Sequence, residues 1–133
     1  EYISIPGEAV YSVPDNLDFK RAAYAEPITA ALAALKADIT PQQRGLLLGT
    51  NRIAQLTSRI LAMHDFNAVT MHDLNGPAPA SNAYDFVIET QATTDTLRQA
   101  VDCLKPGGRL VLKSRQFVPV EKVINTQVQK ELR

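Results

Sequence analysis

The chain has 133 residues, of which 45% are hydrophobic and 21% charged, a composition typical of one globular domain and not of a disordered chain. Its 14 basic and 14 acidic residues cancel, so no basic field attracts nucleic acid or anionic lipid. The apolar runs are too short to cross a bilayer, and the first residues lack the order of a signal peptide, so we expect no membrane partner. A single cysteine, Cys103, allows no internal disulfide, and a cytoplasmic protein is the expectation.

The first half of the sequence predicts one buried strand between two helices. Residues 3–14 have the pattern of short extended pieces and turns, because their apolar residues stand around Pro6 and Pro14. Residues 25–36, AEPITAALAALK, are rich in Ala and Leu, and Pro27 stands where a first helical turn tolerates it. Residues 44–49, RGLLLG, form an apolar run bounded by turn signals, as in a strand covered on both faces. Apolar residues then recur at helical spacing over residues 52–63.

The second half predicts three strands and one helix. Residues 67–72 mix polar and apolar side chains, which favours an edge strand. A loop rich in Pro, Gly, Ala and Asn follows, and then a strand over residues 84–89 and a helix over residues 94–104. We expect the run Lys-Pro-Gly-Gly at 105–108 to end this helix, and residues 109–113 to form the last strand.

This order of elements predicts an α/β architecture. Strands that alternate with helices are typical of a mostly parallel sheet with helices packed on its faces. The segment from Pro119 onward alternates weakly, and its pattern predicts no element.

The residues after the first buried strand match a dinucleotide-binding turn in part. In the fingerprint G-x-G-x-x-G/A the three positions are Gly49, Asn51 and Ala54, so that only the first is glycine and the third is the accepted alanine. A glycine at the middle position lets the backbone approach a pyrophosphate, whereas Asn51 has a Cβ in that space. Arg52 stands next to it and offers a guanidinium at a helix N-terminus. The alternative is that Arg52 is a solvated surface residue.

Asp73 stands where the same fingerprint expects an acid. It follows Ala54 by 19 positions, at the end of the second strand, where a carboxylate binds the adenine ribose. Such a ligand favours NAD over NADP, because a carboxylate repels a 2′-phosphate. The alternative is a turn in which Asp73 forms a local hydrogen bond before Asn75-Gly76. The two roles do not exclude each other.

Most of the chain resembles the cofactor-binding domain of the medium-chain, zinc-type alcohol dehydrogenase superfamily. The resemblance lies in the order of five stretches, AAYAEPITAALAAL, RGLLLGTNRIAQLTSRILA, AVTMHDLN, YDFVIETQATTDTLRQAVDCLKPGGRLVLKS and VQKELR. It implies a Rossmann-like three-layer α/β/α fold with a mostly parallel, reduced sheet over residues 25–133, incomplete at its C-terminus. Residues 1–24 are similar to the segment that links that family's N-terminal catalytic domain to its nucleotide domain, which implies a truncated piece of a longer chain.

The resemblance also assigns roles to individual residues. Gly49, Thr50, Asn51, Arg52 and Ala54 fall on or beside the pyrophosphate turn. Asp73 falls on the ribose acid, and Thr90 ends the strand after which the family places small residues near the nicotinamide ribose. The alternative for that turn is that Thr93 and Thr94 cap the next helix. Glu26, in Ala-Glu-Pro, falls on an acid that lies close to the catalytic zinc in polyol-dehydrogenase-like members.

Three departures limit what the resemblance implies for this chain. The family's middle glycine is Asn51. Only ten residues separate Asp73 from Tyr84, where the family fits a helix, a third strand and another connection, so the Asp73 strand is expected at the sheet edge. The zinc-binding Cys and His of the family belong to the absent catalytic domain, and Glu26 alone is no zinc site.

These departures set our expectations for activity. We expect no catalytic residue in this fragment, weak or no NAD binding by the isolated chain, NADP as the less favoured cofactor, and zinc only in the full-length protein. A small alcohol or carbonyl compound is the substrate implied for that longer protein. The related domains often pair through a strand near their C-terminal end, which also allows a homo-oligomer.

Two other interpretations remain open. YDFVI followed by LKPGGRLVL is also similar to the later motifs of S-adenosylmethionine-dependent methyltransferases, although RGLLLGTN lacks the acid and repeated glycines that those enzymes carry. A degenerate, non-catalytic Rossmann module used for structure or oligomerisation is the third. His64 and His72 have no Cys or Glu at ligand spacing and are expected at the surface or on the edge strand, and Cys103 is expected in the core.

Overall fold

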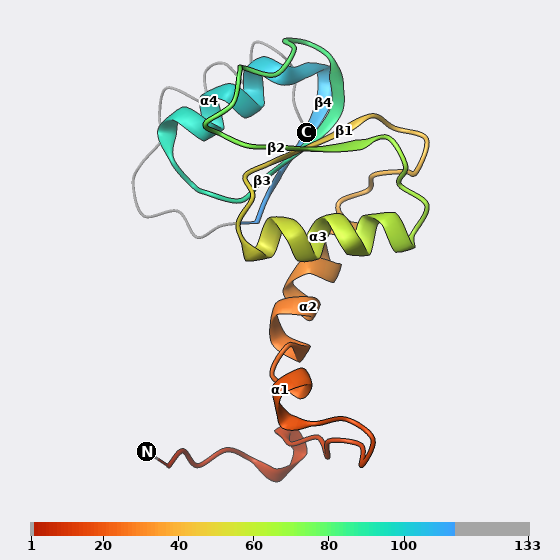
Figure 1. Cartoon of the computed structure of the whole chain (residues 1–133), viewed down its shortest axis with the longest axis vertical. Coiled ribbons are helices and arrows are strands. Elements are labelled where there is room, and N and C mark those ends of the chain that lie inside the picture. Colours follow the sequence, from red (N-terminus) through yellow and green to blue (C-terminus); the bar gives the residue numbers. More distant parts are fainter. Residues whose placement is uncertain (1, 114–133) are drawn as a thin grey trace.

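The computed structural model describes residues 2–113, which form one sheet with helices on both sides and an N-terminal arm that extends away from it (Figure 1). We use the term arm for residues 2–24. The elements follow in chain order as η1 (Gly7–Ala9), α1 (Phe19–Ala22), α2 (Ala25–Leu32), η2 (Ala33–Lys36), β1 (Gly45–Leu48), α3 (Arg52–Met63), β2 (Val69–His72), β3 (Tyr84–Glu89), α4 (Thr94–Cys103) and β4 (Leu104–Leu112).

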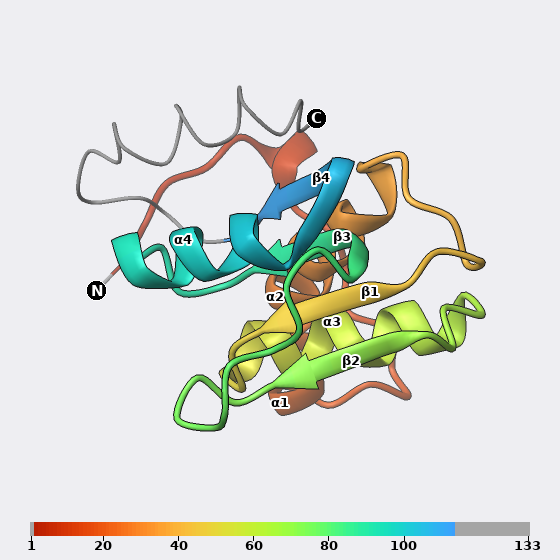
Figure 2. The ribbon, with the colours of Figure 1, turned by 90° about the horizontal axis from the view of Figure 1, so that it is seen from above.

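The sheet is parallel, with the strand order β2-β1-β3-β4 (Figure 2). The predicted edge position of the second strand is confirmed, since β2 pairs only with β1 among the described residues. The loop from Asp73 to Tyr84 is too short for another helix and strand, and Figure 2 shows it crossing β1 on the side that carries α4. The mixed pattern of β2 therefore follows from its place at the edge.

Two apolar clusters cover the two faces of the sheet. Side chains alternate along a strand, so Phe86 and Ile88 of β3 face α3, whereas Val87 between them faces α4. The cluster on the α3 side contains Ala34, Ile39, Leu47, Ala54, Leu61, Phe66, Phe86 and Ile88. The cluster on the α4 side contains Leu46, Leu48, Tyr84, Val87, Ala100, Cys103 and Leu104. The predicted three-layer α/β/α fold and the buried Cys103 are both confirmed.

Gly45 begins β1 directly beneath an aromatic ring. A Cβ on Gly45 would lie 2.2 Å from Cζ of Phe86, and the Phe86 ring is itself fully buried and packs edge-on against Phe66 at 6.1 Å between ring centroids. The ring therefore fills the space that any side chain at position 45 needs. Gly45 is required here for close approach and not for turn geometry.

The predicted helix over residues 25–36 is α2 with a tighter final turn, η2. Two cationic side chains, one in β4 and one directly after it, hold this helix and the loop after it on the sheet. Arg109 donates to the carbonyl of Ala37 and lies 2.7 Å from the Asp38 carboxylate, and Lys113 donates to the carbonyl of Ala30. Burial lowers the pKa of the Lys113 ammonium group. None of the helices over residues 2–113 is both long and apolar enough to cross a bilayer.

The predicted helix over residues 94–104 is α4, but the prediction that the Lys-Pro-Gly-Gly run ends it was wrong. Helix α4 ends at Cys103, and Leu104 is already extended and begins β4, which is longer than the predicted strand. Leu104 pairs with Tyr84, and the next regular pair joins Arg109 to Phe86, so the Lys-Pro-Gly-Gly run forms an irregularity within the strand. Gly107 has a left-handed backbone, with φ 74°, but it lies within this irregular part of the strand and not at the end of a helix. Burial of Leu104 against the sheet favours an extended residue directly after the helix, so no glycine cap forms.

Acid is expected to remove the contribution of Asp85 to stability. Donation from Lys105, whose Nζ lies 2.6 Å from Oδ1, and from the backbone N–H of Arg44 lowers the pKa of Asp85. The folded chain therefore binds this proton less readily than the unfolded chain, so the contribution is complete above about pH 4 and is lost as the pH falls through the lower folded-state pKa. Because the pair is partly exposed, we expect it to contribute about 1 kcal/mol or less.

Urea unfolding of Asp85→Asn against the wild-type chain tests this expectation. The variant should be less stable at pH 7, and the difference should shrink below about pH 4. Asp95→Asn is the matched control, since it removes the more exposed ion pair with Arg98. A difference between Asp85→Asn and wild type that stays constant with pH would contradict the assigned cause.

Candidate functional site

The carboxyl ends of β1 and β3 meet at the turn that leads into α3. Gly49 has a φ of 106°, and a Cβ there would lie 2.6 Å from Oγ1 of Thr90. The hydroxyl of Thr90 is buried and donates to the carbonyl of Leu48 at 2.7 Å, so β3 holds the end of β1 in place. Gly49 is therefore required both for its left-handed backbone and for its contact with Thr90.

Asn51 is the N-cap of α3 and has an ordinary extended backbone, with φ −67° and ψ 174°. Its Oδ1 accepts from the backbone N–H of Ala54 at 2.9 Å. Its Nδ2 donates to the carbonyl of Thr90 at 2.9 Å and lies 3.3 Å from the Thr90 hydroxyl oxygen. The middle position of the fingerprint thus needs no positive φ in this chain, and its side chain joins the helix to β3.

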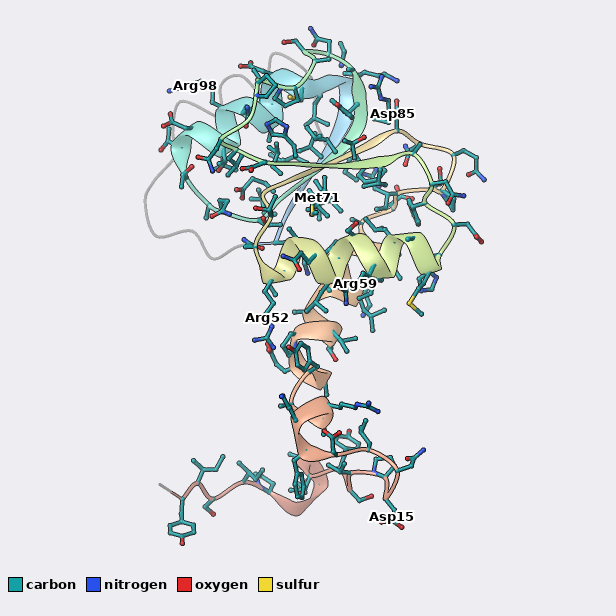
Figure 3. All side chains as sticks on the ribbon, in the orientation of Figure 1. Asp15, Arg52, Arg59, Met71, Asp85 and Arg98 are labelled. Atoms are coloured by element: carbon teal, nitrogen blue, oxygen red, sulfur yellow. The ribbon has the colours of Figure 1, made fainter. Side chains whose placement is uncertain are left out.

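Arg52 points away from the sheet. Its guanidinium lies over the ring of Tyr24, 4.5 Å from the ring centroid, and Figure 3 shows the side chain directed from α3 toward α2. This geometry is that of a cation–π contact. Arg52 therefore joins the first turn of α3 to the residue that precedes α2.

The two remaining turn residues differ in burial. Thr50 is exposed, and its carbonyl accepts from Nε2 of Gln55 at 3.0 Å. Ala54 is fully buried in the cluster on the α3 side. A small residue at the third fingerprint position allows close packing of helix on strand, and Ala54 occupies that place.

Asp73 follows β2 and forms the local turn that was the alternative interpretation of this residue. Its Oδ1 accepts from the backbone N–H of Asn75 at 3.0 Å and from the Asn75 side chain at 3.2 Å, and its carbonyl accepts from Gly76. Within residues 2–113, Oδ2 of Asp73 has no hydrogen-bond partner. Beside it, Nε2 of His72 is buried and has no hydrogen-bond partner among the described residues. His72 lies on the edge strand as expected, and His64 is exposed.

Glu89 has a role in the turn between β3 and α4 that was not predicted from the sequence. This side chain is fully buried at the end of β3, and its Oε1 accepts from the backbone N–H groups of Gln91 and Ala92 at 2.6 and 2.9 Å and from the Thr96 hydroxyl at 2.8 Å. Ala92 has a left-handed φ of 57°. The carboxyl group therefore shapes the turn between β3 and α4. The available signal was an acid directly after the apolar run Phe86–Ile88 of a buried strand.

Thr93 is the N-cap of α4, as the alternative interpretation predicted. Its hydroxyl accepts from the backbone N–H of Thr96 at 3.1 Å, and the Thr93 backbone N–H donates to the Thr96 hydroxyl. Asp95 adds negative charge in the first turn. The caps of α3 and α4 thus lie on the turns after β1 and β3, at the carboxyl ends of two neighbouring strands.

Comparison with solved structures finds the fold of this chain in dehydrogenases. No family model matches the sequence, and no curated protein is significantly similar to it. A short chain alcohol dehydrogenase of Escherichia coli CFT073, solved with NADH, matches with a TM-score of 0.80 and 18% identity over 96% of this chain and 46% of that chain. The chain has a Rossmann-like fold.

Two further structures share this Rossmann-like fold. A protein of Sinorhizobium meliloti 1021, classed as a candidate zinc-binding dehydrogenase and bound to NADP, matches with a TM-score of 0.78 and 21% identity over 92% of this chain and 45% of that chain. Galactitol-1-phosphate dehydrogenase of Escherichia coli matches with a TM-score of 0.74 and 18% identity over 96% and 46%. The chain spans less than half the length of these proteins. The resemblance that the motifs indicated is confirmed for the fold.

The described part of this Rossmann-like domain does not fit a zinc ion. Glu26 is exposed in the first turn of α2. Within residues 2–113 no three His, Cys, Asp or Glu side chains lie close enough together to hold a metal. Structural zinc takes four protein ligands and catalytic zinc takes three, so Glu26 has no ligand set around it there.

Proposed function

We propose that this chain is the nucleotide-binding domain of an NAD(P)-dependent alcohol or polyol dehydrogenase of the medium-chain, zinc-type superfamily. In this proposal residues 25–133 form that domain and residues 1–24 link it to a catalytic domain, so the chain is not catalytically complete in isolation. The substrate, a small alcohol or carbonyl compound, belongs to the longer protein. The proposal rests on the likeness of fold to structures solved with NADH and NADP.

One observation carries the cofactor assignment. Gly49 turns the chain from β1 into the N-terminus of α3, where the first N–H groups have no acceptor within the helix, and Asp73 ends the neighbouring strand β2. Helix N-termini after the first strand of such folds bind pyrophosphate, and an acid after the second binds ribose hydroxyls. The Asp73 side chain is exposed, and its local hydrogen bonds from Asn75 use only Oδ1, so Oδ2 is open to a ribose hydroxyl.

The proposal favours NAD over NADP. The carboxylate of Asp73 accepts hydrogen bonds from a ribose diol but repels a 2′-phosphate. The shortened loop between Asp73 and Tyr84 leaves this side of the site without the extra strand of larger relatives. We therefore expect weak binding of the dinucleotide by this chain.

Fluorescence titration with NADH tests the function. We expect saturable enhancement, weaker binding of NADPH and no binding of S-adenosylmethionine. Asp73→Ala should weaken NADH binding roughly tenfold, because a ribose hydrogen bond to a charged acceptor is lost. Asp65→Asn is the control, because it removes the charge of an exposed acid outside these turns and keeps a residue type that tolerates the left-handed φ of 65°; it should leave the affinity unchanged. Absence of saturable NADH binding by wild type and by Asn51→Gly would leave a structural Rossmann module, and binding of S-adenosylmethionine would favour the methyltransferase interpretation.

A further inference from the structure

Asn51 already occupies one of the N–H groups that an anion would use at this turn. The helix offers its first N–H groups at positions 52, 53 and 54, and Oδ1 of Asn51 takes the third of them. Its Nδ2 is bound at the same time to the carbonyl of Thr90, 39 residues later in the chain. The side chain therefore bridges the first turn of α3 and the residue that follows β3.

The acceptor residue, Thr90, follows β3 and is itself bonded to the end of β1. Thr90 is buried, and its hydroxyl donates to the carbonyl of Leu48 on the adjacent strand. The backbone of Asn51 itself is unstrained, with φ −67° and ψ 174°, so nothing in the turn geometry requires this side chain. A glycine or serine fits the same backbone. The side chain at position 51 therefore matters for its hydrogen bonds and not for the backbone conformation of the turn.

We propose that Asn51 is a gate on the dinucleotide site, which its side chain closes by bridging Ala54 and Thr90. This inference rests on the proposed function. A pyrophosphate reaches the third N–H of α3 only when Oδ1 leaves it, and it approaches the turn only when Nδ2 releases Thr90. The bridge thereby lowers the affinity for the cofactor, and the residue at position 51 determines the size of this reduction.

Three chains with different side chains at position 51 test the gate in NADH titrations. Asn51→Gly removes the cap and the bridge, and should bind NADH about tenfold or more tightly than wild type, since each displaced hydrogen bond corresponds to roughly a factor of five. Asn51→Ser keeps a side-chain oxygen that caps the helix but loses the amide that reaches Thr90. Its affinity should lie between those of the other two chains.

The matched control is a cap outside the site. Asp18 caps α1 on the arm, and its Oδ1 accepts from the backbone N–H of Arg21 at 2.8 Å, the same i to i+3 pattern as Asn51. Asp18→Gly should change stability without changing NADH affinity. In amide spectra of the wild-type chain, NADH should shift the side-chain signals of Asn51 together with the backbone signal of Ala54.

The outcomes separate the gate from the function. Wild type that binds NADH as tightly as Asn51→Gly, or more tightly, overturns the gate and leaves the proposed function intact. Asn51→Ser that matches wild type while Asn51→Gly gains affinity overturns the role of the Thr90 bridge. Absence of NADH binding in all three folded chains overturns both proposals.

Discussion

Alanine in place of Gly45 is expected to destabilise the domain by about 3 kcal/mol, at the upper end of the usual cost of overpacking. The added Cβ would lie 2.2, 2.4 and 2.9 Å from three atoms of the Phe86 ring. The ring has no free space to move into, because it is fully buried in the cluster on the α3 side and contacts Phe66. Either the ring leaves its position, which costs packing on the α3 face, or β1 shifts away from β3, which costs packing on both faces of the sheet.

Urea unfolding followed by circular dichroism measures this loss. Gly7→Ala is the matched control, since a Cβ on Gly7 has no atom within 4 Å, and it should change the free energy of unfolding by less than about 0.5 kcal/mol. Phe86→Leu removes the ring that clashes with the added Cβ. The double variant should therefore lose less stability than the sum of the losses in Gly45→Ala and Phe86→Leu. Purely additive losses in the double variant would contradict the assigned clash.

The sequence predicted the elements wherever local pattern and tertiary burial agree. The apolar run of β1 and the helical spacing over α3 gave nearly the observed bounds, and the mixed pattern of β2 indicated the edge. Where local and tertiary signals disagree, the prediction was wrong. The Lys-Pro-Gly-Gly run has the composition of a helix stop, yet Leu104 before it is drawn into the sheet because it pairs with Tyr84 and is buried.

The residues of the candidate site also fall into two groups: those whose places could be predicted from the sequence, and those whose contacts could not. Gly49, Ala54 and Asp73 have fixed places relative to strand ends, and their positions follow from the order of elements. Contacts between distant residues carry no such pattern. The Asn51 amide meets Thr90, and the Arg52 guanidinium meets Tyr24, because the fold brings β3 and α2 to the turn. Residue type alone assigned Arg52 to a phosphate, whereas its position favours a contact with the arm side of the domain.

Removal of the Glu89 carboxyl group is expected to destabilise the domain by about 3–5 kcal/mol. Glu89→Ala leaves the N–H groups of Gln91 and Ala92 and the hydroxyl of Thr96 without this acceptor. Thr96 is buried, and Ala92 keeps an unfavourable left-handed backbone that the hydrogen bond stabilises. The variant also opens a cavity in a fully buried position.

Two further variants separate the hydrogen bonds from the volume of the side chain. Glu89→Gln keeps an acceptor oxygen of the same size and should lose less stability than Glu89→Ala in the urea unfolding experiment. Asp95→Ala removes an exposed acid three residues after Ala92 and should cost about 1 kcal/mol or less. If Glu89→Ala unfolds at the same urea concentration as wild type, the turn after β3 does not depend on this carboxyl group. In that case the position of Thr90, on which the Asn51 bridge depends, does not rest on Glu89.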